Sequence, residues 1–332
     1  MRLLVTGGAG FIGSSFIRHV LSAHPDDSVV NLDKLTYAGN LQNVADLAED
    51  PRYRFVHGDV CDSKLVRETL RGIDAVVNFA AESHVDRSLL GADAFLKTDV
   101  FGVFTLLEAV RELSVSRFVQ ISTDEVYGSL ATGSARESDP LRPSNPYSAA
   151  KAGADLLALA YWRTYRLPVV ITRSSNNFGP YQHPEKVIPL FITNALDDQP
   201  LPLYGDGRNV RDWLYVLDNC EAIDLVLRQG VAGEIYNVGA GHELENIAVT
   251  QEILRLTGKP PTLVQLVTDR PGHDRRYSLD ASKVRRLGWT PRHRFLDGLA
   301  ATVRWYREHE AWWRALKSGA FAAYYQQQYG SR

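Results

Sequence analysis

A tyrosine and a lysine one helical turn apart, Tyr147 and Lys151, are the residues best suited to proton transfer. At positions i and i+4 their side chains lie on one face of a helix. A free tyrosine hydroxyl has a pKa of about 10, and a neighbouring cation favours its ionised form. Such a pair can take a proton from an alcohol while hydride leaves the same carbon. Because the spacing is common by chance, other features must support it.

Three polar residues, Thr123, Asp124 and Glu125, follow a predicted strand. A hydroxyl at a strand end can hydrogen-bond a reacting alcohol, and Thr123 is suited to this role. Two adjacent carboxylates whose environments separate their pKa values can divide the roles of acid and base. A dehydration needs both roles, whereas a simple oxidation or epimerisation does not. In the alternative interpretation Asp124 caps a turn and Glu125 is solvated.

A glycine-rich turn, Gly7-Gly8-Ala9-Gly10-Phe11-Ile12-Gly13, follows the first predicted strand and opens a helix. Its spacing fits both G-x-G-x-x-G and G-x-x-G-x-x-G. Glycines let the backbone approach a pyrophosphate, and the helix N-terminus offers free N–H groups to the phosphates. The alternative is a turn without a ligand. We expect Gly7, Gly10 and Gly13 to bind a dinucleotide.

The acidic residue Asp33 indicates which dinucleotide is bound. It ends the second predicted strand, 20 residues after Gly13, where a carboxylate accepts hydrogen bonds from the adenosine ribose. Since this charge repels a 2′-phosphate, NAD is favoured over NADP. The adjacent Lys34 is interpreted as a solvated side chain. Asp59, at the next strand end, either bonds the adenine amino group or caps the helix that begins at Ser63.

Short apolar runs alternate with amphipathic segments and must position these residues. The predicted helices are Phe11–Leu21, Asp99–Leu113 and Tyr147–Tyr165. The predicted strands, rich in Val and Ile, are Leu3–Thr6, Val29–Asp33, Tyr53–Val56, Ala75–Ala80, Phe118–Ser122 and Val169–Thr172. The alternation predicts an α/β fold, a doubly wound parallel sheet of the Rossmann type with helices on both faces. Ligands of such sheets bind beyond the carboxyl ends of the strands.

The alternation weakens after about Arg173. Asn176–Pro189, rich in Asn, Pro, Tyr and His, is predicted to be a long ordered loop. We divide the chain into a NAD-binding Rossmann-type domain at 1–175 and a smaller α/β substrate-binding lobe at 176–332, with a segment at about 208–240 returning to the first domain. The aromatic stretch Trp305–Tyr329 is predicted to be a helix docked on the body.

The composition excludes other classes of protein. Its 332 residues, 45% hydrophobic and 23% charged, are typical of a globular chain of roughly two domains. Lys+Arg 37 against Asp+Glu 39 leaves a net charge of −2, so no basic field exists for nucleic acid or an anionic membrane. Two cysteines cannot build a disulfide framework, and the sequence has neither a signal-peptide pattern nor a membrane-spanning run. We expect a cytoplasmic protein.

Together these features resemble the extended short-chain dehydrogenase/reductase superfamily, and longer strings resemble one of its families, the dTDP-glucose 4,6-dehydratases. The strings are Leu32–Asn40, Ala80–Ser88, Ser122–Gly128, Asn176–Gln182, Glu185–Pro189 and Arg270–Asp274. The similarity runs from residue 1 to about 310. Two departures are Phe178, where the family often has Tyr, and His183, where an aromatic residue is common.

The resemblance implies that dTDP-glucose is dehydrated to dTDP-4-keto-6-deoxyglucose while NAD is regenerated. Tyr147 takes the C4 hydroxyl proton as hydride passes to NAD. Glu125 removes the C5 proton, and Asp124, held protonated, donates to the departing C6 hydroxyl. The hydride then returns to C6. Thr123 and Lys151 complete the implied catalytic set.

Arg211 is a candidate ligand of the sugar nucleotide, because a guanidinium binds a diphosphate bidentately. The alternative is a surface ion pair with Asp206 or Asp212. Around the sugar nucleotide the resemblance also places Ser83, Thr123, Asn176, Lys186, Val187, Pro202, Leu203, Tyr204, Asn246, Arg270 and His273. Around NAD it adds Phe11, Ile12, Lys34, Leu35, Thr36, Asp59, Val60, Ala80, Ala81, Ser83, Thr98, Tyr147, Lys151 and Asn177.

The resemblance further implies a homodimer formed by Asp99–Leu113 and Tyr147–Tyr165 of each subunit. No metal is expected, because neither His84 nor His273 has a second ligand at a suitable spacing. Two alternative functions remain open. One is another sugar-nucleotide enzyme, a 4-epimerase or a decarboxylase, which Asp124 disfavours. The other is a non-catalytic NAD-binding regulator.

Overall fold

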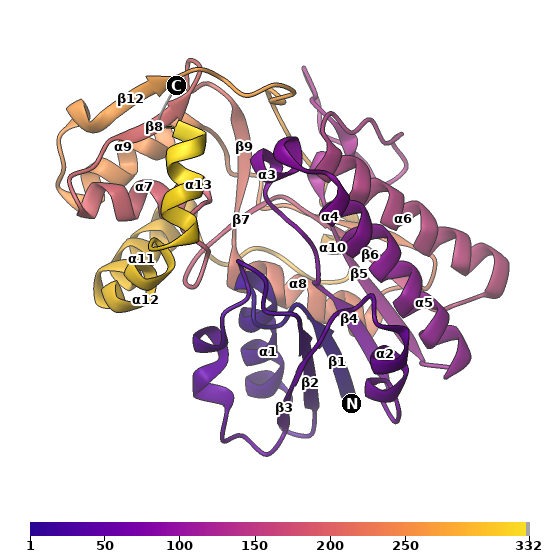
Figure 1. Cartoon of the computed structure of the whole chain (residues 1–332). Coiled ribbons are helices and arrows are strands. Elements are labelled where there is room, and N and C mark those ends of the chain that lie inside the picture. The colour runs from indigo at the N-terminus through magenta and orange to yellow at the C-terminus, as the bar shows by residue number, and fades with distance from the viewer. Residues whose placement is uncertain (330–332) are drawn as a thin grey trace.

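The structure is a computed structural model that describes residues 1–329. A seven-stranded parallel sheet lies at the centre of its larger part (Figure 1). The strand order is β10-β6-β5-β4-β1-β2-β3. The strands are β1 (Arg2–Thr6), β2 (Ser28–Asp33), β3 (Tyr53–His57), β4 (Ala75–Asn78), β5 (Arg117–Thr123), β6 (Val169–Ser174) and β10 (Ile235–Val238). The predicted doubly wound fold is confirmed, and each of the six predicted strands lies within two residues of its expected bounds.

Helices cover both faces of this sheet. Successive strand residues face opposite layers, so Leu3 packs against α1 (Phe11–Ala23) and α8 (Val216–Gln229). Its neighbour Leu4 packs against the layer on the other face. That layer consists of α2 (Ser63–Thr69), α5 (Gly102–Glu112) and α6 (Pro146–Tyr165). Because both faces of the central strands are buried, these strands are mostly apolar and appear in the sequence as short, nearly continuous runs.

The chain changes direction in the sheet between β1 and β4. Strands β2 and β3 lie on one side of β1, whereas β4, β5 and β6 lie on the other. Connections leaving the two central strands therefore diverge and open a crevice beyond their carboxyl ends. The glycine turn after β1, Asp33 at the end of β2 and Thr123 at the end of β5 all lie at this edge.

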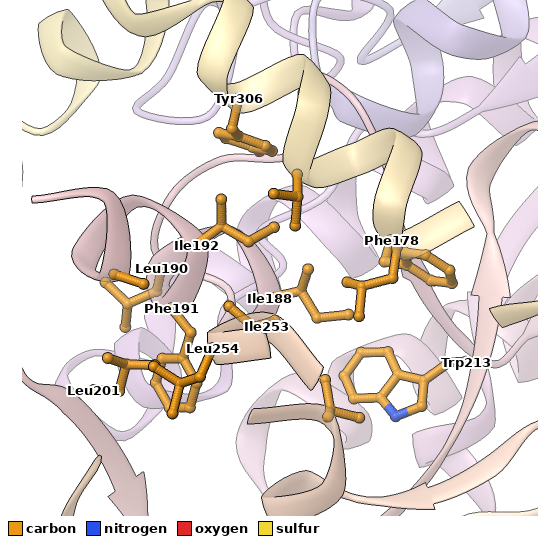
Figure 2. Packing of buried hydrophobic residues seen from close by; sticks show 14 of the residues in the cluster. Phe178, Ile188, Leu190, Phe191, Ile192, Leu201, Trp213, Ile253, Leu254 and Tyr306 are labelled. Atoms are coloured by element: carbon orange, nitrogen blue, oxygen red, sulfur yellow. The ribbon is translucent and has the colours of Figure 1, made fainter. Parts of the chain in front are cut away.

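The second half of the chain builds a smaller lobe. It contains a three-stranded sheet, β11-β9-β7, and a two-stranded sheet, β12-β8. Phe178, Phe191, Trp213, Ile253 and Tyr306 are among its buried core residues (Figure 2). The strands are β7 (Asn176–Phe178), β8 (Leu201–Tyr204), β9 (Val210–Tyr215), β11 (Glu243–Glu245) and β12 (Val264–Val267). The helices are α7 (Val187–Leu196), α9 (Asn246–Thr257), η4 (Pro261–Leu263), α11 (Phe295–Glu308), α12 (Glu310–Leu316) and α13 (Ala320–Tyr329).

Short helical segments fill the remaining connections. After β2 comes η1 (Leu41–Leu47), after β5 comes η3 (Asp124–Tyr127), and α10 (Ser282–Arg286) packs beside β10. Between β4 and α5 the chain forms α3 (Val85–Leu90), α4 (Asp93–Phe95) and a π-helical turn, η2 (Leu96–Phe101). Every helix within residues 1–329 is too short or too polar to cross a membrane.

Three predictions about elements were wrong. Asn176–Pro189 is not a continuous loop, because β7 pairs in parallel with β9 and α7 begins at Val187. A three-residue polar strand has no periodic signal, and its partner lies more than 30 residues away. The helix predicted to begin at Asp99 begins instead at Gly102, and Asp99 lies in the π-helical turn before it. The aromatic stretch Trp305–Tyr329 forms the end of α11 and two further helices, docked on the lobe as expected.

The segment at about 208–240 divides between the two sheets. β9 belongs to the three-stranded sheet. In contrast, β10 is an edge strand of the seven-stranded sheet, and α8 packs against one face of that sheet. The division of the chain into a cofactor domain and a substrate lobe stays a prediction. The last three residues of the predicted lobe, 330–332, lie outside the described residues.

Candidate active site

Two adjoining cavities lie at the carboxyl edge of the large sheet. The larger, of about 290 Å³, is lined by the glycine turn and by residues that follow β2, β4 and β5. The smaller, of about 150 Å³, is lined mainly by the smaller lobe. Glu125, Asn176 and Lys186 are among the residues that line both cavities. Molecules bound in the two cavities would therefore meet beside Glu125.

The glycine turn is packed so closely that side chains at Gly7 and Gly13 would clash with neighbouring backbone atoms. Gly7 has a φ of +67°, and a Cβ there would lie 2.7 Å from the backbone nitrogen of Ala80. A Cβ on Gly13 would lie 2.3 Å from the carbonyl oxygen of Gly7. Helix α1 begins at Phe11, and no side chain of the described residues caps it. Its first N–H groups remain available, so the turn fits the pyrophosphate of a dinucleotide.

Asp33 joins the glycine turn to the end of β2. One carboxylate oxygen accepts a hydrogen bond from the Ala9 N–H at 2.9 Å, and the other from the Leu35 N–H at 2.8 Å. The carboxylate lines the larger cavity, and burial raises its pKa. Both oxygens keep acceptor capacity for ribose hydroxyls. Its position therefore agrees with the ribose contact expected from the sequence.

The neighbouring cation Lys34 is half-exposed and forms an ion pair. Its Nζ lies 2.8 Å from a carboxylate oxygen of Asp59, so the charge is engaged away from Asp33. The side chain of Asp59 does not cap α2, because Asp62 accepts the N–H groups of Lys64 and Leu65. The suggested capping role of Asp59 was wrong, since the cap lies three residues further along the chain.

The larger cavity brings together almost every residue predicted to touch the cofactor. Leu35 is the exception, because it takes part through its backbone bond to Asp33 and lies outside the lining. The predicted residues in the lining are Gly7, Gly10, Phe11, Ile12, Gly13, Asp33, Lys34, Thr36, Asp59, Val60, Ala80, Ala81, Ser83, Thr98, Tyr147, Lys151 and Asn177.

Helix α6 carries the tyrosine and lysine pair into the same cavity. The helix starts with a capping box in which Asn145 and Ser148 bond each other's backbone N–H groups, and Pro146 occupies the first turn. This local sequence fixes Tyr147 in the first turn. Lys151 Nζ donates a hydrogen bond to the carbonyl oxygen of Ile121 in β5 at 2.6 Å, which ties the pair to the strand that ends at Thr123.

Asp124 is a buried acid beside this pair. The Thr123 hydroxyl donates to one of its carboxyl oxygens at 3.1 Å, and the other has no hydrogen-bond partner within residues 1–329. Burial, reinforced by the charge of Glu125, raises the pKa of Asp124 to about 8. The carboxyl group therefore holds a proton at neutral pH. The turn-capping alternative was wrong, because Thr123 caps η3 by accepting the Glu125 N–H at 3.2 Å.

The pKa of Tyr147 is raised, whereas its lysine neighbour was expected to lower it. Burial raises it well above the usual value, and the carboxyl groups of Glu125, Asp99 and Asp124 raise it further. The sequence shows only the lysine one turn away, whereas the fold adds three acids from other segments. Without ligands the hydroxyl is therefore neutral.

The smaller cavity contains ten of the residues predicted for the sugar nucleotide. They are Asn176, Lys186, Val187, Pro202, Leu203, Tyr204, Arg211, Asn246, Arg270 and His273. The other two, Ser83 and Thr123, line the larger cavity. Three of these side chains, Lys186, Arg211 and Arg270, are cationic and come from segments far apart in the chain.

Arg211 is buried, with 5% of its surface exposed. It donates to the carbonyl oxygen of Asp274 at 2.9 Å, and its guanidinium carbon lies 4.3 Å from the ring centre of Tyr277. The alternative of a surface ion pair was wrong. Asp206 instead pairs with Arg275, and Asp212 accepts the backbone N–H of His242.

Sequence reasoning missed Asp99, which lies in the π-helical turn before α5. One of its oxygens accepts the Glu82 N–H at 2.9 Å, and the other is buried without a partner within residues 1–329. Burial raises its pKa to about 7, against the opposing charge of Lys151. An aspartate near the start of a helix is an ordinary first-turn residue, so the sequence has no signal for this placement.

A second group that the sequence did not indicate lies away from both cavities. His19 and His24, in α1 and just after it, approach Asp224 of α8, with their Nε2 atoms 3.2 and 2.7 Å from one carboxylate oxygen. Arg228 donates to the other oxygen at 2.7 Å. These contacts satisfy the carboxylate and hold α1 against α8.

Comparisons with known proteins show similarity over nearly the whole chain. The family model described as GDP-mannose 4,6 dehydratase matches residues 4–302. A dTDP-glucose 4,6-dehydratase from Streptomyces niveus is 54% identical over 323 residues, which are 96% of this chain and 96% of that protein.

Solved structures are similar over nearly the whole chain. DesIV, a dTDP-glucose 4,6-dehydratase from Streptomyces venezuelae solved with NAD bound, has a TM-score of 0.94 and 58% identity, covering 96% of this chain and 100% of its own. The UDP-glucose 4-epimerase of Thermus thermophilus, also solved with NAD, has a TM-score of 0.86 and 33% identity, covering 93% and 100%. The chain belongs to the dTDP-glucose 4,6-dehydratase family of the extended short-chain dehydrogenase/reductase superfamily.

Proposed function

We propose that the protein is an NAD-dependent dTDP-glucose 4,6-dehydratase, a hydro-lyase that forms dTDP-4-keto-6-deoxyglucose. The observation that carries this proposal is the protonated Asp124 carboxyl beside Glu125, where the two cavities meet. An elimination needs one group that removes a proton and another that donates one, and a pair of carboxyl groups can divide these roles. The relatives that carry this name support the choice of substrate and of NAD.

Each catalytic side chain has one task in this reaction. Bound NAD supplies the hydride acceptor and donor. With NAD bound, the positive charge of its ring and that of Lys151 would favour the ionised form of Tyr147, which then takes the proton of the C4 hydroxyl. Thr123 hydrogen-bonds the same oxygen, and Lys151 lies one turn further along the same helix face. The C4 ketone acidifies the C5 proton, which Glu125 removes. Asp124 then gives its proton to the C6 hydroxyl, which leaves as water, and hydride returned to C6 completes the 6-deoxy sugar as C5 is reprotonated.

The sugar nucleotide fits the charge of the smaller cavity. Lys186, Arg211 and Arg270 line it, and guanidinium groups are well suited to the two phosphates. We assign the nucleotide to this cavity and NAD to the larger one. In this arrangement the reacting hexose lies beside Glu125, within reach of the carboxyl groups and of Tyr147.

The alternatives are distinguished by the same residues. A 4-epimerase or decarboxylase does not expel the C6 hydroxyl and has no task for a protonated Asp124. A regulator that only binds NAD has no task for the Tyr147 and Lys151 pair. The likeness of the fold to a UDP-glucose 4-epimerase shows why the fold alone does not choose among them.

The decisive experiment incubates the purified chain with NAD and dTDP-glucose and follows the alkaline absorbance of a 4-keto sugar. We expect turnover, and we expect Glu125→Gln and Asp124→Asn to lose roughly 10²–10⁴-fold, the usual size for one acid–base group. Glu125→Gln should accumulate bound NADH and stop solvent deuterium entering C5. Full turnover in both variants would show that these carboxyl groups are structural and that the enzyme is not a dehydratase.

We further propose a homodimer and a cytoplasmic location. Leu96, Phe101, Phe104 and Leu156 expose between 39% and 59% of their surfaces on the neighbouring elements η2, α5 and α6. Large apolar side chains gathered on adjacent helices are typical of a subunit interface.

The two cysteines are free thiols, which suits a reducing compartment. Residues 1–175 with α8 and β10 are assigned to the cofactor domain, and most of the rest to the substrate lobe.

A further inference from the structure

The last helix, α13, lies against the binding cleft. It occupies the side of the smaller lobe that faces α3 (Figure 1). Phe321, Tyr324 and Gln328 are buried at a spacing that defines one helix face. The side chains on the opposite face are exposed; they are Ala322, Ala323, Gln326 and Gln327. The buried face contains polar groups, so it does more than fill a hydrophobic core.

Gln328 begins a chain of hydrogen bonds that leads into the smaller cavity. Its Nε2 donates to the Tyr204 hydroxyl at 2.7 Å, and that hydroxyl donates to Asp86 at 2.9 Å. The other oxygen of Asp86 accepts from Arg270 at 3.0 Å. Tyr204, Arg270 and the neighbouring Tyr329 all line the cavity. The orientation of a cavity-lining cation therefore depends on a side chain of the last helix.

Tyr324 contacts a second charged group, Arg87, which lines neither cavity but pairs with Glu185, a residue that lines both. The guanidinium of Arg87 is enclosed by two rings, at 3.9 Å from the ring centre of Tyr37 and 4.2 Å from that of Tyr324. Arg87 also pairs with Glu185 at 2.8 Å, and Glu185 lines both cavities. Tyr37 belongs to the segment after β2 whose neighbours line the larger cavity.

We propose that α13 is a positioning element for both ligands: Gln328 sets Tyr204, Asp86 and Arg270 for the sugar nucleotide, and Tyr324 holds Arg87, which sets Glu185 where the two cavities meet. This inference rests on the proposed function, because dTDP-glucose and NAD are the ligands that test it. Arg87 held between two rings keeps its partner Glu185 in one position, so removing one ring weakens the binding of both ligands without removing any direct contact.

The first test compares Gln328→Leu with Gln326→Leu, the same change two residues earlier on the exposed face. We expect Gln328→Leu to raise the Kd for dTDP-glucose about fivefold to tenfold, the usual effect of one buried hydrogen bond. The Kd for NAD and the kcat should stay within about twofold of the unchanged protein. Gln326→Leu should alter neither affinity. Equal dTDP-glucose affinity in the two variants would overturn the inference.

The second test compares Tyr324→Phe with Tyr324→Leu. The phenylalanine keeps the ring over Arg87 and loses only the hydroxyl near His84, so it should bind both ligands as the unchanged protein does. The leucine removes the ring and should weaken both NAD and dTDP-glucose several-fold. If the leucine variant bound both as tightly as the phenylalanine variant, the role of Tyr324 would be refuted; if the leucine variant does not fold, Gln328→Leu decides the inference.

These results separate the inference from the proposed function. Unmodified protein that neither binds nor dehydrates dTDP-glucose would overturn both. Unmodified protein that binds and dehydrates it, with Gln328→Leu matching Gln326→Leu, would leave the proposed function standing and overturn only the role of α13.

Discussion

Two adjacent carboxyl groups just after β5 differ in their burial. Asp124 and Glu125 are neighbours in sequence, yet only Asp124 is buried. A buried carboxyl avoids the cost of carrying charge away from water by keeping its proton. Among residues 1–329 its hydrogen-bond partner is Thr123, and its second oxygen, which has none there, remains available to a substrate.

The raised pKa of Asp124 predicts a stability effect. Between the ordinary carboxyl range and about pH 8 the folded chain binds one more proton at this site than the unfolded chain does. Raising the pH therefore lowers the free energy of unfolding, by up to about 1.4 kcal/mol per pH unit for one proton. Asp124→Asn removes this dependence. The free energy of urea unfolding of the variant, minus that of the unchanged protein, should therefore increase from pH 6 to pH 8. A constant difference across that range would place the pKa of Asp124 in the folded chain below about 6.

Asp33 predicts the cofactor preference. Its carboxylate is held by the N–H groups of Ala9 and Leu35, and the adjacent Lys34 is paired with Asp59. A 2′-phosphate would meet the carboxylate without a free cation beside it, so the unchanged protein should prefer NAD to NADP. Asp33→Ala should reduce the preference for NAD over NADP by about tenfold or more, because one charge repulsion with the 2′-phosphate is lost. Equal affinities in the unchanged protein would contradict this role.

At the scale of elements, α6 must be held against β5 and β6 because it carries Tyr147 and Lys151. Beyond Lys151 the helix places Asp155 in the interior, 2.9 Å from Arg173 Nε of β6 and 2.9 Å from the Ser122 hydroxyl of β5. Both partners of this ion pair are almost fully buried. A pair of this kind contributes to orientation, and breaking it leaves an uncompensated charge.

Breaking that pair should therefore be costly. Asp155→Ala leaves the Arg173 guanidinium buried and unpaired, and we expect a loss of about 3–5 kcal/mol in the free energy of urea unfolding. The double variant Asp155→Leu/Arg173→Met should recover most of this loss, because neither charge remains. Arg111→Ala, which removes a surface pair with Glu108, is the control and should cost less than about 1 kcal/mol. A loss for Asp155→Ala no larger than the control would show that the pair is dispensable.

At the scale of the whole molecule, the exposed apolar side chains of η2, α5 and α6 predict self-association. Light scattering should give about twice the subunit mass of 37.1 kDa. Leu156→Glu puts a charge among Leu96, Phe101 and Phe104 and should yield the monomer. Leu296→Glu changes a leucine of α11 that is similarly exposed, at 54%, outside this group and should leave the mass unchanged. A monomeric unmodified protein would contradict the proposed homodimer.

Much of the site could be predicted because its chemistry is local in sequence. The glycine turn, Asp33, the three residues at the end of β5 and just beyond it, and the Tyr147 and Lys151 pair each form a short pattern attached to one strand or helix. Parallel strands bring their carboxyl ends to one edge, so placing each pattern on its element is enough to place them together. The six strands were predictable for a similar reason, since burial on both faces makes the central ones nearly continuous apolar runs.

The tertiary structure alone decided the charges and the long-range contacts. The expectation for Tyr147 considered Lys151 and lacked Asp99, whose approach depends on the π-helical turn. Gln328 meets Tyr204 across 124 positions in the chain, and no local pattern marks either residue as a partner of the other. Sequence by itself determined the fold class and the kind of cofactor, because those follow from local periodicity and spacing. Protonation states and the placement of α13 depend on burial and on packing between distant segments, and these exist only after the chain has folded.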